Sequence, residues 1–321
     1  MKFIEAAVRT TSEAADLVAE FAREEGALGA YIIDRNDLNQ RGDAALWDAI
    51  DDETLNAMPE DALVRAVFPP ERAGGVATLR ERLDALLKES FGLDVGTLES
   101  SSRELDDADW ADAWKKHFKP FRVGKRLVVK PSWETYVSEP CDVVLELDPG
   151  MAFGTGTHET TALCLELLEE IVREGDTALD VGTGSGILAI AAAKLGAKRV
   201  IAVDQDPDAV KVARGNIERN ALSENIRAVA ADLLDGLERS ADTRAYVIGR
   251  SDLVVANILA DVIIRLMPSA FTALRAGGRM IASGIIKDRA QDTRDAFSQT
   301  GFVIESERTS GEWVAMSARK G

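Results

Sequence analysis

The chain has 321 residues, of which 46% are hydrophobic, and a formal net charge of −17 at pH 7. This length predicts two domains, and the negative charge argues against a surface that binds nucleic acid by itself. The two cysteines, Cys141 and Cys164, have neither disulfide-framework nor zinc-ligand spacing, so no metal site is predicted. Because residues 1–8 lack a signal-peptide pattern and no apolar run could span a bilayer, we expect a cytoplasmic protein that avoids membranes.

The N-terminal part of the chain predicts a small α+β domain. Strands are expected at 2–9, 27–33, 62–68 and 95–101. One helix, capped by Ser12, ends at Gly26, and a second carries Leu79, Leu83, Leu86 and Leu87 on one face. Residues 35–61 predict a loop with a short helix. The resulting β-α-β-β-α-β order is that of a ferredoxin-like domain.

A linker helix is expected to follow this domain. Trp110, Trp114 and His117 lie at helical spacing between residues 106 and 118. The sequence therefore predicts a ferredoxin-like domain over 1–103, a linker over 104–120 and a larger domain over 121–321.

The larger domain shows regular alternation of strands and helices from about residue 160. Its strands are expected at 178–181, 199–203, 226–230, 253–256 and 279–283. This alternation indicates a doubly wound parallel sheet of the α/β class. Residues 302–305 and 313–319, joined by a turn at Ser310-Gly311, predict an antiparallel hairpin at the edge of that sheet.

A glycine-rich turn, Asp180-Val-Gly-Thr-Gly-Ser-Gly186, joins the first of these strands to a helix. Gly182 and Gly184 allow a tight turn and close approach of a ligand, and the following helix points free N–H groups into the same crevice. A dinucleotide fingerprint requires Gly-x-Gly-x-x-Gly, whereas here the third glycine comes one residue early and Ile187 follows it. The pattern resembles the first motif of class I S-adenosylmethionine-dependent methyltransferases.

Three aspartates stand at strand ends where such a cofactor would lie. Asp204 ends the second parallel strand and predicts paired hydrogen bonds to two ribose hydroxyls, the alternative being a helix cap. Asp232 follows the third strand and is expected to read the adenine amino group, although Asp235 is close by. Asp180 is expected either to order the glycine loop or to bind the methionine amino group.

Asn257 ends the fourth strand, in Asn-Ile-Leu, and is the main catalytic candidate. In amine and amide methyltransferases this position often holds Asn-Pro-Pro-Tyr, in which the Asn oxygen and the next backbone carbonyl accept hydrogen bonds from the nucleophilic nitrogen. Methyl transfer needs a neutral amine lone pair in line with the methyl group, so positioning should supply most of the rate. The alternative is an ordinary turn residue at a strand end.

A second glycine-rich segment, Pro149-Gly-Met-Ala-Phe-Gly-Thr-Gly-Thr-His-Glu-Thr-Thr161, would by itself be a capped loop in which His158 is structural. Taken with the motifs at 104–114, 130–133, 180–186, 255–260 and 312–313, it resembles the ribosomal protein L11 methyltransferases of bacteria. Asn-Ile-Leu in place of Asn-Pro-Pro-Tyr is what this family shows.

The resemblance implies a class I methyltransferase domain, Rossmann-like, with a mostly parallel seven-stranded sheet. It implies that Thr161, Gly182, Asp204 and Asn257 contact S-adenosylmethionine. From the glycine loop itself we also expect Gly184 and Gly186 to belong to the cofactor site. Phe153 and His158 would line the loop over the reaction centre. The family methylates the N-terminal α-amine and lysine ε-amines of one ribosomal protein, which the N-terminal domain holds, and we expect a monomer. Residues 35–61 fit the family least well.

Three alternatives compete with this interpretation. A related protein-lysine methyltransferase could share the catalytic segments and act on another protein. A dinucleotide-dependent oxidoreductase is disfavoured by Ile187 and by the Asn-Ile-Leu segment. A non-catalytic ribosome-assembly factor would not need Asn257 and the glycine loop together.

Overall fold

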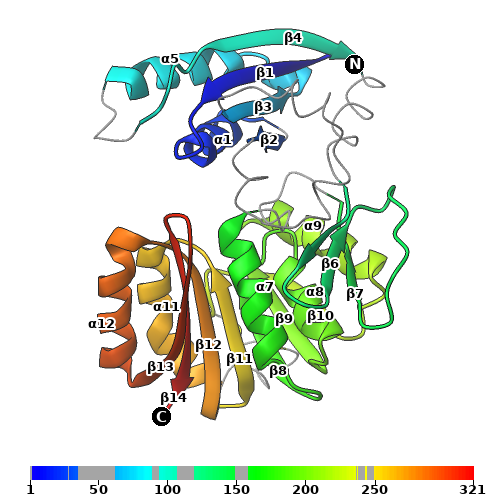
Figure 1. Cartoon of the computed structure of the whole chain (residues 1–321), viewed down its shortest axis with the longest axis vertical. Coiled ribbons are helices and arrows are strands. Elements are labelled where there is room, and N and C mark those ends of the chain that lie inside the picture. The colour runs from blue at the N-terminus through cyan, green and yellow to red at the C-terminus, as the bar shows by residue number, and fades with distance from the viewer. Residues whose placement is uncertain are drawn as a thin grey trace. The chain divides into compact units, whose positions relative to one another are not determined.

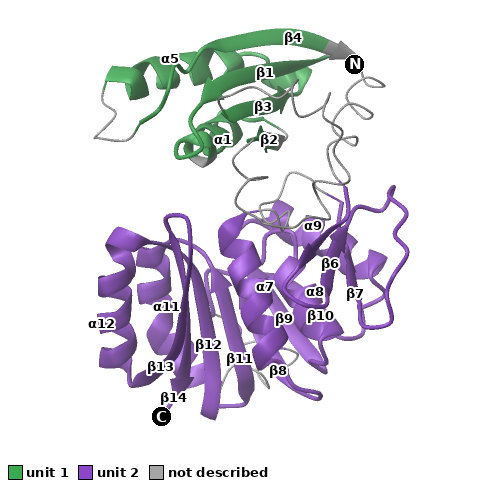
Figure 2. Ribbon diagram, in the orientation of Figure 1, with its two compact units in different colours: residues 1–117 green, residues 118–321 purple. Residues whose placement is uncertain are grey.

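The fold was obtained as a computed structural model, which describes residues 2–27, 29–34, 62–88, 94–106, 119–148, 158–235, 237, 243 and 249–321. The chain divides into two compact units, with the division between His117 and Phe118 (Figure 2). The helix predicted within 35–61 and the linker helix predicted after residue 106 lie outside the described residues. No helix in the described ranges is both long enough and apolar enough to cross a membrane.

Unit 1 is built on a four-stranded antiparallel sheet with the strand order β2-β3-β1-β4. Its elements are β1 (Lys2–Thr10), α1 (Ala15–Glu24), β2 (Gly29–Ile33), β3 (Ala62–Phe68), the short 3-10 helix η1 (Pro70–Arg72), α5 (Gly75–Lys88) and β4 (Ser100–Asp106). Alternate residues of β1, such as Ala6 and Val8, are buried in one cluster with Val18 of α1 and Leu79 of α5. These elements follow the predicted β-α-β-β-α-β order of a ferredoxin-like domain.

The predicted position of the fourth strand is wrong. The strand runs over Ser100–Asp106 instead of 95–101, and its last three residues belong to the segment predicted as linker. Val95 and Leu98 are buried, but they lie in a turn in which Leu98 has a φ of 47° and Thr10 donates to the Val95 carbonyl. The buried apolar residues lie in the turn, whereas the polar edge strand pairs with β1 through the backbone ladder and through an ion pair between Arg103 and Glu5 at 2.9 Å.

Two helix predictions in unit 1 also need correction. Helix α1 begins at Ala15 with Ala14 as its N-cap, and the hydroxyl of Thr11, not of Ser12, accepts a hydrogen bond from the Ala14 N–H. In α5 the side chains of Leu79 and Leu83 are buried, but Leu87 is 44% exposed at the last turn. The apolar stripe is therefore shorter than the predicted one.

Unit 2 contains a seven-stranded sheet, a small three-stranded sheet and five α-helices within the described residues. The small sheet comprises β5 (Phe121–Val123), β6 (Leu127–Lys130) and β7 (Val143–Glu146). The large sheet comprises β8 (Thr177–Val181), β9 (Arg199–Asp204), β10 (Ile226–Ala230), β11 (Ser251–Asn257), β12 (Leu274–Ile286), β13 (Phe302–Ser310) and β14 (Trp313–Lys320). The helices are α7 (Glu159–Ile171), α8 (Ile187–Lys194), α9 (Pro207–Arg219), α11 (Ala260–Ala273) and α12 (Ala290–Thr300), with the 3-10 helix η4 (Lys287–Arg289).

The large sheet has the order β10-β9-β8-β11-β12-β14-β13. Its first five strands are parallel, and β14 runs antiparallel to both β12 and β13, so the predicted edge hairpin is confirmed. Helices α7, α8 and α9 cover one face, and α11 and α12 cover the other (Figure 1). Each face of the sheet packs on these helices in a hydrophobic core, and the side chains of β11 alternate between the two cores. Leu253 and Val255 enter the core beneath α7, α8 and α9, and Val254 and Ala256 enter the core beneath α11 and α12.

This topology brings the glycine loop, Asp204 and Asn257 to one edge of the sheet. The carboxyl ends of β8, β9 and β11 carry the glycine loop, Asp204 and Asn257 respectively. Because β14 is antiparallel, its first residue, Trp313, lies at the same edge. Ligands of open α/β sheets bind at this carboxyl edge.

Candidate active site

The glycine loop between β8 and α8 has three glycines in the left-handed region, with φ values of 77° at Gly182, 52° at Gly184 and 86° at Gly186. The N–H groups of Gly182 and Thr183 both donate to the Val203 carbonyl, at 2.8 and 2.9 Å, so the loop turns over the end of β9. A Cβ on Gly182 would lie 2.3 Å from Cγ2 of Ile258. The loop is therefore pressed against the residue that follows Asn257.

Gly186 has a different role within the same loop. It is the N-cap of α8, and a Cβ there would lie 3.3 Å from the Cβ of Ala213 in α9. From α9 the buried amide of Asn216 also donates to the Ser185 carbonyl at 2.8 Å. The third glycine thus permits close packing of the loop on α9.

Asp180 is completely buried and ties the glycine loop to α8. Its Oδ2 accepts from the Thr183 hydroxyl at 2.6 Å and from the Ala189 N–H at 3.0 Å, whereas its buried Oδ1 has no hydrogen-bond partner. Burial raises the pKa of the Asp180 carboxyl to about 7, opposed by these hydrogen bonds and assisted by the nearby Asp204 charge. The contacts favour the loop-ordering alternative, and the unpartnered oxygen is suited to a cationic ammonium group.

Asp204 is held by two backbone N–H groups. Its Oδ2 accepts from Gly184 at 2.9 Å and its Oδ1 from Asp206 at 3.0 Å. Each carboxylate oxygen has a second acceptor position, so the pre-oriented group can still accept two vicinal hydroxyls. The helix-cap alternative is not what the contacts support, because the N-cap of α9 is Asp206, whose side chain accepts from the Asp208 N–H.

Asp232 lies in the turn after β10, whose start is fixed by a hydrogen bond from the Ala231 N–H to the Asp204 carbonyl at 2.9 Å. Its side chain is 61% exposed and forms an ion pair with Arg265 at 3.3 Å. Such exposed pairs contribute little stability. The backbone just before Asp232 is thus bonded to that of Asp204, and a contact of the Asp232 carboxylate with adenine remains a prediction.

Asn257 and Thr161 meet across the site. The Asn257 side chain donates from Nδ2 to Oγ1 of Thr161 at 3.1 Å. Thr161 is fully buried in the first turn of α7 and Asn257 is half-buried at the end of β11. The hydrogen bond fixes the amide and leaves its Oδ1 as the available acceptor.

His158 is the N-cap of α7, where its Nδ1 accepts from the Thr160 N–H at 3.2 Å. Its ring meets the ring of Trp313 edge-on, with centroids 5.2 Å apart. These contacts give His158 a structural role, and its place over a reaction centre remains a prediction. Phe153 lies outside the described residues.

Three residues at this edge were not predicted as site residues, although the motif at 312–313 includes one of them, Trp313. Ser283 is paired with Asn257 across β11 and β12, and its hydroxyl donates to the Thr160 carbonyl at 3.1 Å. Gly284 follows it with a φ of 86°, and Trp313 contacts His158. Ser283 and Gly284 could have been found from their position in the sequence, since the expected strand 279–283 ends beside the strand that ends at Asn257.

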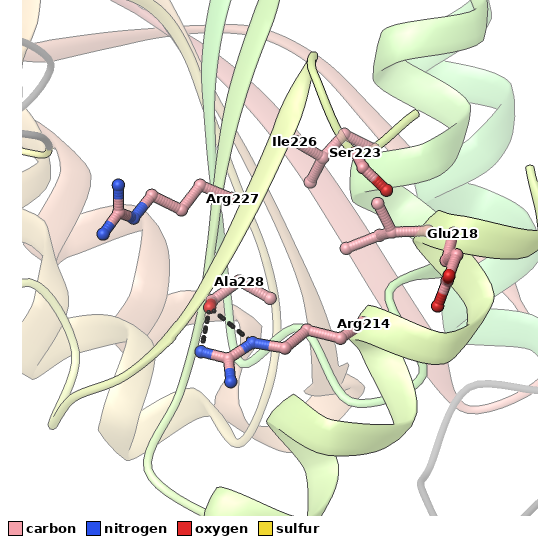
Figure 3. Close-up of a pocket in the computed structure, with 7 residues that line it drawn as sticks. Arg214, Glu218, Ser223, Ile226, Arg227 and Ala228 are labelled. Carbon is pink, nitrogen blue, oxygen red and sulfur yellow. Dashed lines mark hydrogen bonds between the residues drawn. The ribbon is translucent and has the colours of Figure 1, made fainter. Parts of the chain in front are cut away.

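A separate open pocket lies between α9 and β10 and contains none of the predicted site residues (Figure 3). It is lined by Arg214, Ile217, Glu218, Ser223, Ile226, Arg227 and Ala228. Arg214 uses its Nε and Nη2 to bind the Ala228 carbonyl, at 3.1 and 2.7 Å. Because the lining includes Ile226, the first residue of β10, the pocket reaches toward the amino end of that strand, away from the glycine loop.

Comparison with known proteins identifies the family. The model of the family described as ribosomal protein L11 methyltransferase (PrmA) matches residues 2–321. The chain belongs to the ribosomal protein L11 methyltransferase family. It is 44% identical to the ribosomal protein L11 methyltransferase of Pelotomaculum thermopropionicum, over 99% of each chain. It is 42% identical to the one of Thermoanaerobacter sp. strain X514, over the whole of both chains.

A solved structure agrees with this assignment. The crystal structure of ribosomal protein L11 methylase from Lactobacillus delbrueckii subsp. bulgaricus is 33% identical and matches with a TM-score of 0.56, covering 64% of this chain and all of that chain. The predictions of a class I methyltransferase fold, of a methyltransferase activity and of S-adenosylmethionine as cofactor are confirmed. The dinucleotide-dependent oxidoreductase alternative is wrong.

Proposed function

We propose that this chain transfers methyl groups from S-adenosylmethionine to amino groups of ribosomal protein L11, at its N-terminal α-amine and at lysine ε-amines. The observation that carries the proposal is the fixed amide of Asn257 at the edge of the sheet, joined to Thr161 and next to the glycine loop. The names of its full-length relatives support the substrate.

The residues around the glycine loop fit the proposed cofactor. The three positive-φ glycines allow close approach of a ligand, and Asp204 would accept the ribose hydroxyls on its remaining acceptor positions. Asp232 would read the adenine amino group, and the unpartnered Oδ1 of Asp180 suits the methionine ammonium. When bound there, S-adenosylmethionine supplies an electrophilic methyl group.

The amine would be held by two oxygen acceptors. Asn257 Oδ1 and the backbone carbonyl of Ile258 accept its N–H groups, which points the nitrogen lone pair away from them and toward the cofactor crevice. The amine must be neutral to react, and an α-amino group loses its proton more easily than a lysine. Because little acid–base chemistry is needed in the transition state, positioning by these acceptors supplies most of the rate.

Unit 1 is proposed to bind the ribosomal protein. A narrow amine site distinguishes proteins poorly, whereas a standard interface buries roughly 800 Å² on each partner. We assign this recognition to unit 1 and the chemistry to unit 2. We further propose that the protein acts in the cytoplasm as a monomer.

Mass spectrometry of purified ribosomal protein L11 tests the proposal. After incubation with the chain and S-adenosylmethionine, the intact mass should increase by whole methyl groups, and fragmentation should locate them on the N-terminal amine and on lysines. The Asn257→Ala variant is the matched control. If L11 stays unmodified while another protein tested in the same assay is methylated, the alternative of a protein-lysine methyltransferase with another substrate is favoured.

A further inference from the structure

Strand β12 contains a β-bulge beside the proposed amine site. Its pairing with β14 runs from Arg279–Arg319 to Ala282–Met316 and resumes at Ile285–Val314. Two residues of β12, Ser283 and Gly284, therefore stand opposite the single residue Ala315. Bulges of this kind bend a strand locally and occur often next to active sites.

The bulge is in contact with the peptide group that follows Asn257. Ser283 pairs with Asn257, and its carbonyl accepts from the Ile258 N–H at 3.1 Å. A Cβ on Gly284 would lie 2.4 Å from the Ile258 carbonyl oxygen, 3.0 Å from its carbon and 3.1 Å from its nitrogen. All three atoms belong to the backbone, so they cannot yield by a side-chain rotation.

The Ile258 carbonyl is otherwise uncommitted, since no described residue donates a hydrogen bond to it. Its neighbour Leu259 is the N-cap of α11 and binds the N–H groups of Val262 and Ile263. The carbonyl just before the helix thus keeps its acceptor capacity, with Gly284 packed against it on one side.

We infer that Gly284 is a positioning residue, which seats the Ile258 carbonyl as the second acceptor for the substrate amine. This inference rests on the proposed function, because the carbonyl matters only if an amine is methylated beside Asn257. Any side chain at residue 284 must displace the Ile258 peptide by roughly 1 Å, and a misplacement of that size can cost on the order of 100-fold in rate.

The substitution Gly284→Ala tests the inference. In a single-turnover assay at saturating S-adenosylmethionine and L11, the rate constant for methyl transfer should fall at least about tenfold, with the Kd for S-adenosylmethionine changed less than about threefold. The matched control is Gly277→Ala, on the same strand, where φ is 75° and the nearest atom to a Cβ is Nη1 of Arg275 at 3.8 Å. Both variants carry the positive-φ penalty, so both should lower Tm, but only the first should slow transfer.

Three results would overturn the positioning role of Gly284 and leave the proposed function unaffected. They are a normal rate constant in Gly284→Ala, an equal loss in Gly277→Ala, and a loss of cofactor affinity as large as the loss of rate. Inactive wild-type protein would instead contradict the proposed function itself.

A second measurement applies if Gly284→Ala does not fold. Labelling with carbonyl-¹³C isoleucine and ¹⁵N leucine selects two peptide bonds in the whole chain, Ile187–Leu188 and Ile258–Leu259. With S-adenosylhomocysteine present, an N-terminal L11 peptide should shift the Ile258 carbonyl signal and leave that of Ile187 unchanged. An unmoved Ile258 signal at saturating peptide would refute the inference.

Discussion

Asn257 Nδ2 and Thr161 Oγ1 lie 3.1 Å apart, in a hydrogen bond between residues separated by 96 positions in the chain. It joins the end of β11 to the first turn of α7, where Thr161 is fully buried. Since the amide nitrogen is engaged, the bond determines which atom of Asn257 can face an amine. The orientation of Asn257 therefore depends on α7, although neither of the two acceptors proposed for the substrate amine belongs to that helix.

Replacing Thr161 by Val should slow methyl transfer by about tenfold at saturating cofactor, because the acceptor that orients the Asn257 amide is lost while the side-chain shape is kept. Thr161→Ser retains the hydroxyl and should keep most of the rate. Single-turnover kinetics of both variants, alongside their Tm values, check this. Similar rates for the two would show that the hydroxyl does not orient Asn257.

Asn257→Ala should leave the fold intact and reduce methyl transfer on the order of 100-fold, with a much smaller change in cofactor affinity. The reason is that the variant removes an acceptor that positions the amine and leaves the glycine loop untouched. Single-turnover rates and calorimetric Kd values for S-adenosylmethionine measure the two effects separately. Near-normal turnover would make Asn257 an ordinary turn residue.

Asp204→Ala should raise the Kd for S-adenosylmethionine at least tenfold, because each charge-assisted hydrogen bond to the ribose contributes about 1.5–3 kcal/mol. Asp206→Ala provides a control two residues away. It removes the cap of α9, which costs about 1 kcal/mol of stability, and should leave the Kd nearly unchanged. Calorimetry on both variants decides the assignment, which is untenable if Asp204→Ala binds normally.

Asp180 should make the stability of the protein depend on pH. Burial raises the pKa of its carboxyl to about 7 in the folded chain. The folded state therefore holds the proton more tightly than the unfolded state, and this contribution to stability falls as pH rises from about 4 to about 7. Asp180→Asn keeps the shape of the side chain but carries no charge, so its stability lacks this pH dependence. The free energy of unfolding of Asp180→Asn minus that of wild type should therefore increase by on the order of 2 kcal/mol from pH 5 to pH 8.

Urea unfolding of the ligand-free protein at both pH values measures this difference. If the free energies of unfolding of wild type and Asp180→Asn differ by the same amount at both pH values, the buried carboxyl does not change its charge in this range. Cofactor affinity at pH 8 separates the two roles of Asp180. A large loss in Asp180→Asn indicates a contact with the ammonium group, and a small one indicates loop ordering alone.

A chain that starts at Phe121 should fold and bind S-adenosylmethionine but lose at least about tenfold in rate on intact L11. On a short N-terminal L11 peptide, which cannot use unit 1, the truncated and full-length chains should react alike. Calorimetry and mass spectrometry give the two readouts. Equal rates on intact L11 would mean that unit 1 is not the recognition module. If the truncated chain does not fold, the removed segment 106–118, which carries Trp110 and Trp114, is needed to stabilise unit 2.

Local patterns in the sequence determined the sheet and most of the candidate site. The expected strand at 226–230 is observed as Ile226–Ala230, and the glycine loop follows β8 as predicted. Asp204 and Asn257 could be assigned to one crevice because the carboxyl ends of parallel strands share an edge. Such inferences need only the order of strands and the residues at their ends.

Only the tertiary structure decided which groups meet. The bond between Asn257 and Thr161, the packing of Gly186 on Ala213 and the bulge at Gly284 all depend on the register of segments that are distant in the chain. Strand β4 was misplaced for a related reason, since its polar residues are held by the β1 backbone and, at Arg103, by the Glu5 side chain of β1. Hydrophobic periodicity reports which face of an element is buried, whereas hydrogen-bond partners and bulges are fixed by contacts across elements, which a single sequence does not encode locally.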